Sequence, residues 1–132
     1  MTGDQLRQFA MRYAAAWGSQ NAASVADFFS PAASLKINAA SPAVGRAAIA
    51  AAAQGFMTAF PDMAVNMDGI GIQGNQAVFR WTLTGTNTGP GGTGNAVRIS
   101  GYEEWTMGAG GLIGDSKGHF DEAEYQRQLR AR

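Results

Sequence analysis

Residues 80–89 read RWTLTGTNTG and lie in a second half of the chain that is rich in aromatic and β-branched residues. Such residues favour strands, and glycine-containing turns separate one strand from the next. The pattern predicts strands at these ranges: 63–72, 76–87, 96–107 and 111–119. Turns are expected between them, with Gly74-Asn75 as the first, so the four strands should form an antiparallel meander.

The start of the chain is typical of an amphipathic helix. Thr2 or Asp4 can cap its first turn, and Gly18 can end it. Its apolar residues recur at helical spacing and should form one buried stripe: Leu6, Phe9, Ala10, Tyr13, Ala14 and Trp17.

Three further helices and one short strand are expected. Asn21 can cap a short helix that Ser30-Pro31 ends, with these apolar positions: Val25, Phe28 and Phe29. Residues 34–38 form the short strand, and residues 46–60 form an alanine-rich helix. Asp121 precedes a terminal helix at 122–130, which turns Tyr125 and Leu129 inward.

Helices followed by an antiparallel sheet predict a single α+β domain over residues 1–132, in which a curved sheet wraps around the long N-terminal helix. Glycines are unusually frequent in the expected strands and would serve as bends: Gly69, Gly71, Gly74, Gly85, Gly101 and Gly114. A curved sheet that its helices do not fill leaves an internal apolar pocket, the usual form of a small-molecule site.

The composition excludes several classes of partner. Ten basic and ten acidic side chains balance, which argues against nucleic acid. The chain has no cysteine, and no histidine or carboxylate group has metal-ligand spacing, so we expect neither metal nor cofactor. Without a signal peptide or a long apolar run, we expect a cytoplasmic protein that does not bind membranes.

The stretch RWTLTGTNTG resembles the signature strand of the SnoaL-like polyketide cyclases, R-W-T-x-x-G-T-H-x-G, and departs from it only where Asn87 replaces the histidine. Other segments match that family in order and spacing: Gly45-Arg46-x-x-Ile49, Phe60-Pro61-Asp62, Gly111-Leu112-Ile113 and Tyr125–Leu129. The resemblance covers nearly the whole chain. It implies the cone-shaped fold of the nuclear-transport-factor-2 and ketosteroid-isomerase type, often found as a homodimer.

The resemblance also implies a function. The best-known family members close an aromatic polyketide ring by an intramolecular aldol reaction, without metal or cofactor, and one aspartate acts as acid and base. Asp121 occupies that position here. The implied substrate is a largely apolar small molecule with a carbonyl group. Two alternatives stay open on this fold, an isomerase or epoxide hydrolase and a non-catalytic binding or dimerisation module.

Three polar residues alternate along the end of the last expected strand. Lys117, His119 and Asp121 should point to the same side, where His119 could tune or assist the proton transfer by Asp121. Asp121 can instead be only the N-cap of the last helix, and His119 a surface or packing residue. Relatives commonly carry an aromatic residue, usually tryptophan, where Lys117 stands.

A second alternating face comprises Glu103, Trp105 and Met107, and we expect it to line the pocket. Glu103 would then be a second carboxylate at the site. Its alternative is a solvated or salt-bridged position at the sheet edge, which the rarity of buried carboxylates favours.

Several other side chains are candidate substrate contacts. Aromatic residues at helical spacing are more often packing residues, so these are expected only to bind and not to catalyse. The substrate-binding candidates, with Glu103, Trp105, Met107 and Lys117, are Tyr13, Trp17, Phe29, Asn38, Phe56 and Trp81. Asn38 and Asn87 could donate a hydrogen bond to a carbonyl group or could be turn residues.

Overall fold

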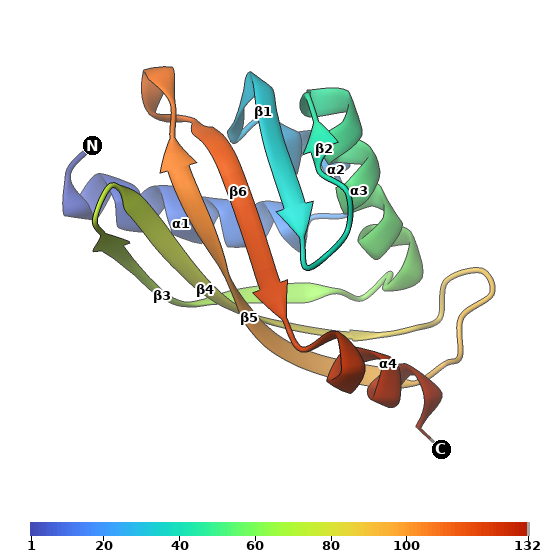
Figure 1. Ribbon diagram of the computed structural model, residues 1–132. Coiled ribbons are helices and arrows are strands. Elements are labelled where there is room, and N and C mark those ends of the chain that lie inside the picture. Colours follow the sequence, from blue (N-terminus) through green and yellow to red (C-terminus); the bar gives the residue numbers. More distant parts are fainter. Residues whose placement is uncertain (132) are drawn as a thin grey trace.

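The computed structural model describes residues 1–131, and Figure 1 shows helices gathered against one curved sheet. The sheet has six strands in the order β2-β1-β6-β5-β4-β3. This mixed α+β architecture with an open, curved sheet confirms the predicted fold class.

Four strands form the expected meander of antiparallel neighbours, β3 (Ala64–Gln73), β4 (Gln76–Thr86), β5 (Ala96–Met107) and β6 (Ile113–Phe120). A short 3₁₀ turn, Ala109–Gly111, joins the last two. The sheet continues beyond the meander, however, because β1 (Phe29–Ile37) pairs with β6 in parallel. The two-residue strand β2 (Ala43–Val44) then pairs with β1 in antiparallel fashion.

The helices lie close to their predicted positions, with α1 at Gly3–Trp17, α3 at Arg46–Ala59 and α4 at Glu122–Arg130. Thr2 caps α1 through a reciprocal capping box with Gln5. The short helix α2 (Ala22–Ala26) ends earlier than predicted, and Phe29 begins β1. Pro31 lacks an N–H group, but it lies where the pairing of β1 with β6 shifts register, so the strand tolerates it.

The core forms between α1 and the sheet. Tyr13 is fully buried and packs edge-on against Trp105 at 5.2 Å and against Phe79 at 5.3 Å between ring centroids. Phe79 and Trp105 themselves stack at 5.0 Å. These contacts place the middle of α1 against the region where the first half of β4 pairs with the end of β5.

Gly101 is one of the predicted bends, and its missing side chain is required. A Cβ atom there would lie 2.3 Å from the carbonyl oxygen of His119 and 2.6 Å from the Trp81 side chain. Real Cβ contacts are not this short, so only glycine allows Trp81 and Phe120 to approach β5 as they do.

Candidate functional site

A cavity of about 60 Å³ lies between the sheet and the helices. Its buried floor and half-buried rim are almost wholly apolar. The lining residues are Trp17, Leu35, Ile37, Phe56, Val65, Phe79, Trp81, Leu83, Ile99, Glu103, Gly118, Phe120 and Tyr125. Glu103 is the one carboxylic acid among these described residues. The predicted internal pocket is therefore present, with a single acidic group in its wall.

Glu103 is held by three donors from three different elements. Its Oε1 accepts hydrogen bonds from Ser116 Oγ at 2.7 Å, from Trp105 Nε1 at 3.0 Å and from the Tyr13 hydroxyl at 3.0 Å. Its Oε2 has only the same Tyr13 hydroxyl, at 3.3 Å. One carboxylate oxygen is thus saturated, while the other has no donor of its own among residues 1–131.

The surroundings of Glu103 favour its neutral form. Burial raises the pKa of Glu103 above the ordinary glutamate value of 4.5. The hydrogen bonds from Ser116, Trp105 and Tyr13 act in the opposite direction and offset part of that rise. Neither ion pair of the described chain involves Glu103. A carboxyl group whose pKa moves toward neutrality can take up and return a proton near physiological pH.

The expectation for Glu103, Trp105 and Met107 is met in part. Glu103 lines the cavity and is only 7% exposed, so the solvated or salt-bridged position at the sheet edge is excluded. Trp105 is fully buried below the cavity, where it supports Glu103. Met107 packs on the edge of the core and is not part of the cavity lining.

Lys117 and His119 share a face of β6, as predicted, but that face points away from the cavity. The inner face of β6 carries Ser116, Gly118 and Phe120. In the pairing of β5 with β6, these residues lie opposite Trp105, Glu103 and Gly101, respectively. The expectation that Lys117 and His119 line the pocket is therefore corrected. Alternation predicts which residues share a face, and only the pairing register decides which face is inside.

His119 interacts with neighbours on the outer face of the sheet. Its Nε2 lies 2.8 Å from Glu104 Oε1, and its ring stacks on Tyr102 at 4.7 Å. The side chains of His119 and Glu104 are 41% and 33% exposed. His119 and Asp121 are thus not brought together at the cavity.

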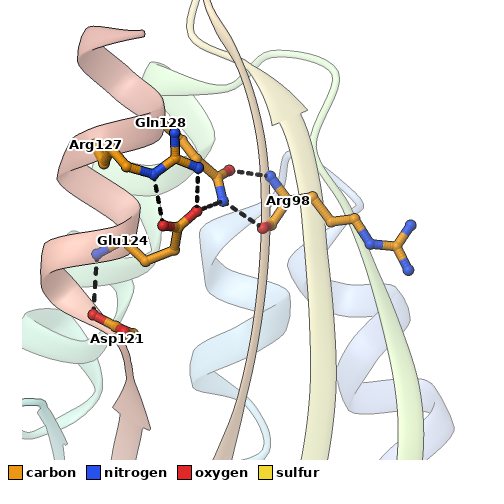
Figure 2. A network of polar contacts seen from close by, with 5 residues as sticks. All are labelled: Arg98, Asp121, Glu124, Arg127 and Gln128. Atoms are coloured by element: carbon orange, nitrogen blue, oxygen red, sulfur yellow. Dashed lines mark hydrogen bonds and ion pairs between the residues drawn. The ribbon is translucent and has the colours of Figure 1, made fainter.

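Asp121 follows β6 and caps α4. Its carboxylate accepts a hydrogen bond from the backbone N–H of Glu124 at 3.0 Å (Figure 2). The Asp121 side chain is exposed and is not part of the cavity lining. The capping role that its sequence allowed is therefore present.

Of the remaining candidates, Trp17, Phe56 and Trp81 line the cavity together with Glu103. Tyr13 reaches the site through its bond to Glu103, and Phe29 is a core residue outside the lining. Two candidates hold turns instead of facing the cavity, Asn38 and Asn87. Asn38 has φ of 51° and accepts the N–H of Phe120, and the Asn87 amide donates to the carbonyl of Ala59.

Sequence reasoning missed most of the aliphatic lining and missed Ser116. These residues come from β1, β3, β4, β5 and β6: Leu35, Ile37, Val65, Leu83, Ile99 and Ser116. Ser116 alternates with Gly118 and Phe120, which predicts that the three share a face of β6 but not that this face is the inner one. Tyr125, predicted to point inward from the last helix, does line the cavity.

The helix α4 brings Tyr125 to the rim and is itself tied to β5. Figure 2 shows the side-chain amide of Gln128 bonded to both backbone groups of Arg98. Gln128 Oε1 accepts a hydrogen bond from the Arg98 N–H at 2.6 Å, and Gln128 Nε2 donates to the Arg98 carbonyl oxygen at 3.0 Å. Glu124 links Gln128 to Arg127 in the same network. This end of the cavity is therefore covered by a helix that polar contacts join to β5 and that packs on the core through Tyr125 and Leu129.

Two features are absent from residues 1–131. They contain no group of three or more histidine and carboxylate side chains that could hold a metal ion. In the same residues, no helix has the length and hydropathy needed to span a membrane.

Comparison with solved structures gives fold relatives over nearly the full length of the chain. A protein with a ketosteroid isomerase-like fold from Catenulispora acidiphila DSM 44928, in complex with trimethylamine, has a TM-score of 0.82 at 13% identity, covering 95% of this chain and 94% of that chain. TsrD from Streptomyces laurentii has a TM-score of 0.83 at 18% identity, with 100% and 99% covered. A putative SnoaL-like polyketide cyclase from Jannaschia sp. CCS1 has a TM-score of 0.78 at 16% identity, with 98% and 94% covered.

At these identities the similarity to solved structures shows the fold alone. No curated protein matches the chain at a significant level. The model of the SnoaL-like domain family matches residues 10–115, a range that includes Tyr13, Trp17 and Glu103. The fold, the cavity and this match lead to one conclusion: the chain belongs to the SnoaL-like domain family.

Proposed function

We propose that this protein is an enzyme that uses Glu103 for acid and base chemistry on a small, largely apolar carbonyl compound. The observation that carries the proposal is the position of Glu103, a buried carboxyl group with a raised pKa in the wall of an otherwise apolar cavity. Such a group costs stability, so its presence in a cavity points to proton transfer.

The chemistry follows from the two oxygens of Glu103. Oε1 is fixed by three donors, so the freer Oε2 takes a proton from the carbon next to the substrate carbonyl. Where a carbon–carbon double bond is conjugated with the resulting enolate, the enolate takes the proton back at the far end of that double bond, which is isomerisation. Where the substrate has a second carbonyl group, the enolate attacks its carbon, which is aldol cyclisation. In the second case Glu103 returns its proton to the new alkoxide, and the enzyme is regenerated.

The size of the cavity bears on the substrate. At about 60 Å³ it is far smaller than the roughly 300–1,000 Å³ of pockets for drug-sized ligands. A small ketone needs little rearrangement, whereas a polyketide needs the rim residues Phe56, Trp81 and Tyr125 to move apart. The cavity thus favours a small carbonyl compound, and the polyketide cyclisation implied by the family resemblance stays a prediction.

The test is exchange of α-hydrogens in D₂O, followed by NMR, with 2-butanone, cyclopentanone and cyclohexanone as probes. Wild-type protein should accelerate exchange of at least one probe, and Glu103→Gln should lower that acceleration by about 100-fold or more, since general-base catalysis contributes roughly 10²–10⁴-fold. Glu104→Gln is the matched control, because Glu104 is the next residue on β5 and points to the outer face with His119. Equal exchange by wild type and Glu103→Gln, or none by wild type, contradicts the proposal.

The assignment of the chemistry to Asp121, assisted by His119, is the competing proposal. It is supported by the family resemblance and requires a substrate to react at the end of β6 instead of in the cavity. Asp121→Asn and His119→Ala in the same exchange assay distinguish the two. Loss of exchange in Asp121→Asn with retention in Glu103→Gln would favour the competing assignment.

Two other proposals rest on the resemblance. A non-catalytic binding module would bind ketones without exchanging their α-hydrogens, so the same assay separates it from an enzyme.

A homodimer is also expected from the resemblance. Sedimentation equilibrium of the purified protein at micromolar concentration checks it, and a monomer at all concentrations contradicts that expectation.

A further inference from the structure

The indole N–H of Trp17 is a buried donor with no hydrogen-bond partner among residues 1–131. Trp17 is 8% exposed and lines the cavity. A buried unpaired donor costs roughly 1–3 kcal/mol, and native structures contain few of them. The contrast with Trp105 is informative, because the N–H of Trp105 donates to Glu103 at 3.0 Å.

The unpaired N–H belongs to a side chain that packs on Tyr13, and the Tyr13 hydroxyl donates to Glu103. Tyr13 and Trp17 lie on successive turns of α1, with their rings edge-to-face at 6.4 Å. The indole is close enough to the phenol to lower the pKa of Tyr13, against the larger rise caused by burial and by the charge of Glu103, yet the geometry falls short of a hydrogen bond. The site therefore has one unused donor, Trp17 Nε1, and one underused acceptor, Glu103 Oε2.

This unused donor and this underused acceptor match the two polar features of a carbonyl compound. A carbonyl oxygen accepts one hydrogen bond without needing a donor partner in return, which suits a wall that is otherwise apolar. The carbon next to it presents the acidic hydrogen that Oε2 can accept. A water molecule between the same two groups would have only two polar partners, the minimum of the two to four that buried waters have.

We infer that Trp17 binds the carbonyl oxygen of the substrate, so that the cavity selects small ketones and related carbonyl compounds over hydrocarbons of the same shape. This inference rests on the proposed function for the role of Glu103, but the binding of the oxygen by Trp17 can be tested without any turnover. The same hydrogen bond stabilises the negative charge that develops on the oxygen when the α-hydrogen leaves.

The experiment compares cyclopentanone with methylenecyclopentane, which replaces the carbonyl oxygen by a CH₂ group. In ¹H–¹⁵N spectra of the wild-type protein, cyclopentanone should move the Trp17 indole N–H resonance downfield, and methylenecyclopentane should not. Trp17→Phe should lower the affinity for cyclopentanone about tenfold, which corresponds to the loss of roughly one hydrogen bond. The affinity for methylenecyclopentane should change by no more than about twofold. Trp81→Phe makes the same change at a second tryptophan of the lining, and it should alter the affinity for the two probes by the same factor.

The outcomes separate this inference from the proposed function. Equal weakening of both probes in Trp17→Phe, binding of neither probe, or an unmoved Trp17 resonance in the wild type overturns the inference, even where Glu103→Gln abolishes exchange. Conversely, a probe preference lost in Trp17→Phe, together with no exchange by the wild type, supports the binding role of Trp17 and contradicts the proposed function. The spectra of the wild type keep the test valid where a variant fails to fold.

Discussion

Glu103 has a stability cost as well as the chemical role proposed for it. Its carboxyl group is buried without a basic partner, and its bonds to Ser116, Trp105 and Tyr13 compensate only part of the cost of removing it from water. Those donors also orient the group and leave Oε2 the freer oxygen. The arrangement suits a group that must change its protonation state inside the protein.

Asp121 offers a residue-scale test of cap against catalyst. Asparagine caps helices about as well as aspartate, and alanine does not, so Asp121→Asn should keep the stability of the protein while Asp121→Ala should lose about 1 kcal/mol. Both free energies of unfolding are measured by urea denaturation. Under the Glu103 proposal, Asp121→Asn also keeps α-hydrogen exchange at the wild-type rate. Loss of exchange with unchanged stability would instead return the catalytic role to Asp121.

Gly101 and Gly118 provide a matched pair on the inner face of the sheet. Gly101→Ala should destabilise by about 3 kcal/mol, because its Cβ would collide with the backbone oxygen of His119 and with Trp81. The Cβ of Gly118→Ala would lie at an ordinary 3.6 Å from Glu103 Cγ, so this variant should fold normally and only narrow the cavity. Thermal unfolding and cyclopentanone affinity measure the two effects. Similar stability of the two variants would contradict the collision at Gly101.

At the scale of an element, α4 depends on polar contacts with β5. No residue of α4 is fully buried, but Tyr125 packs on Phe120 at 5.5 Å and reaches the cavity. Gln128 satisfies the backbone of Arg98 at a position where β5 extends beyond its pairing with β6 (Figure 2). We expect such a helix to open at a lower free energy than the core, and its opening would widen access to the cavity.

Removing the Gln128 amide tests this description of α4. Gln128→Ala should increase hydrogen–deuterium exchange of amides in residues 122–130 by about tenfold, since roughly 1–2 kcal/mol of hydrogen bonding to Arg98 is lost. Gln126→Ala is the control, because Gln126 bonds only to Glu122 on the same helix. Mass spectrometry of peptides from α4 measures both variants. An equal effect of the two substitutions would show that the link to β5 does not hold the helix.

At the scale of the whole molecule, the cavity exists because a bent sheet and three helices do not fill the space between them. The lining comes from α1, α3, α4 and five strands, so no single element forms the site. The protonation of Glu103 is therefore coupled to global folding, since the unfolded chain exposes the same carboxyl group to water.

This coupling predicts a pH dependence of stability. The pKa of Glu103 is raised in the folded state, so its contribution is fully present below the ordinary value of 4.5 and is lost as the pH rises through the folded-state pKa. Glu103→Gln removes that loss, so the free energy of unfolding of the variant relative to wild type should increase as the pH rises above 4.5. Urea denaturation at a series of pH values measures it. A difference independent of pH would mean that Glu103 titrates normally.

Other carboxyl groups change the pH dependence of stability in the opposite direction, and they are present in both the wild type and Glu103→Gln. A hydrogen bond from Arg127 is the main cause that lowers the pKa of Glu124 to about 2, and backbone bonding to Thr86 lowers the pKa of Asp62. Their contributions are present above the unfolded pKa and are lost as the pH falls. Comparing Glu103→Gln with wild type cancels them and isolates Glu103.

Much of the fold was predictable because its signals are local. The stripe from Leu6 to Trp17 predicted α1, and the turn residues separated β3, β4, β5 and β6 close to their observed bounds. The parallel pairing of β1 with β6 was not predicted, since it joins segments about 80 residues apart and leaves no pattern in either one. The same is true of the hydrogen bond between Tyr13 and Glu103, which spans 90 positions.

The sequence by itself determined the elements, the family resemblance and the pairs of residues that share a strand face, because helical and strand periods and turn preferences act between near neighbours. Only the tertiary structure decided which face is inside. Pairing of Glu103 with Gly118 turns Ser116 and Phe120 toward the cavity and Lys117 and His119 away from it. A shift of one residue in that register would exchange the two sets, and no local property of the strand distinguishes them.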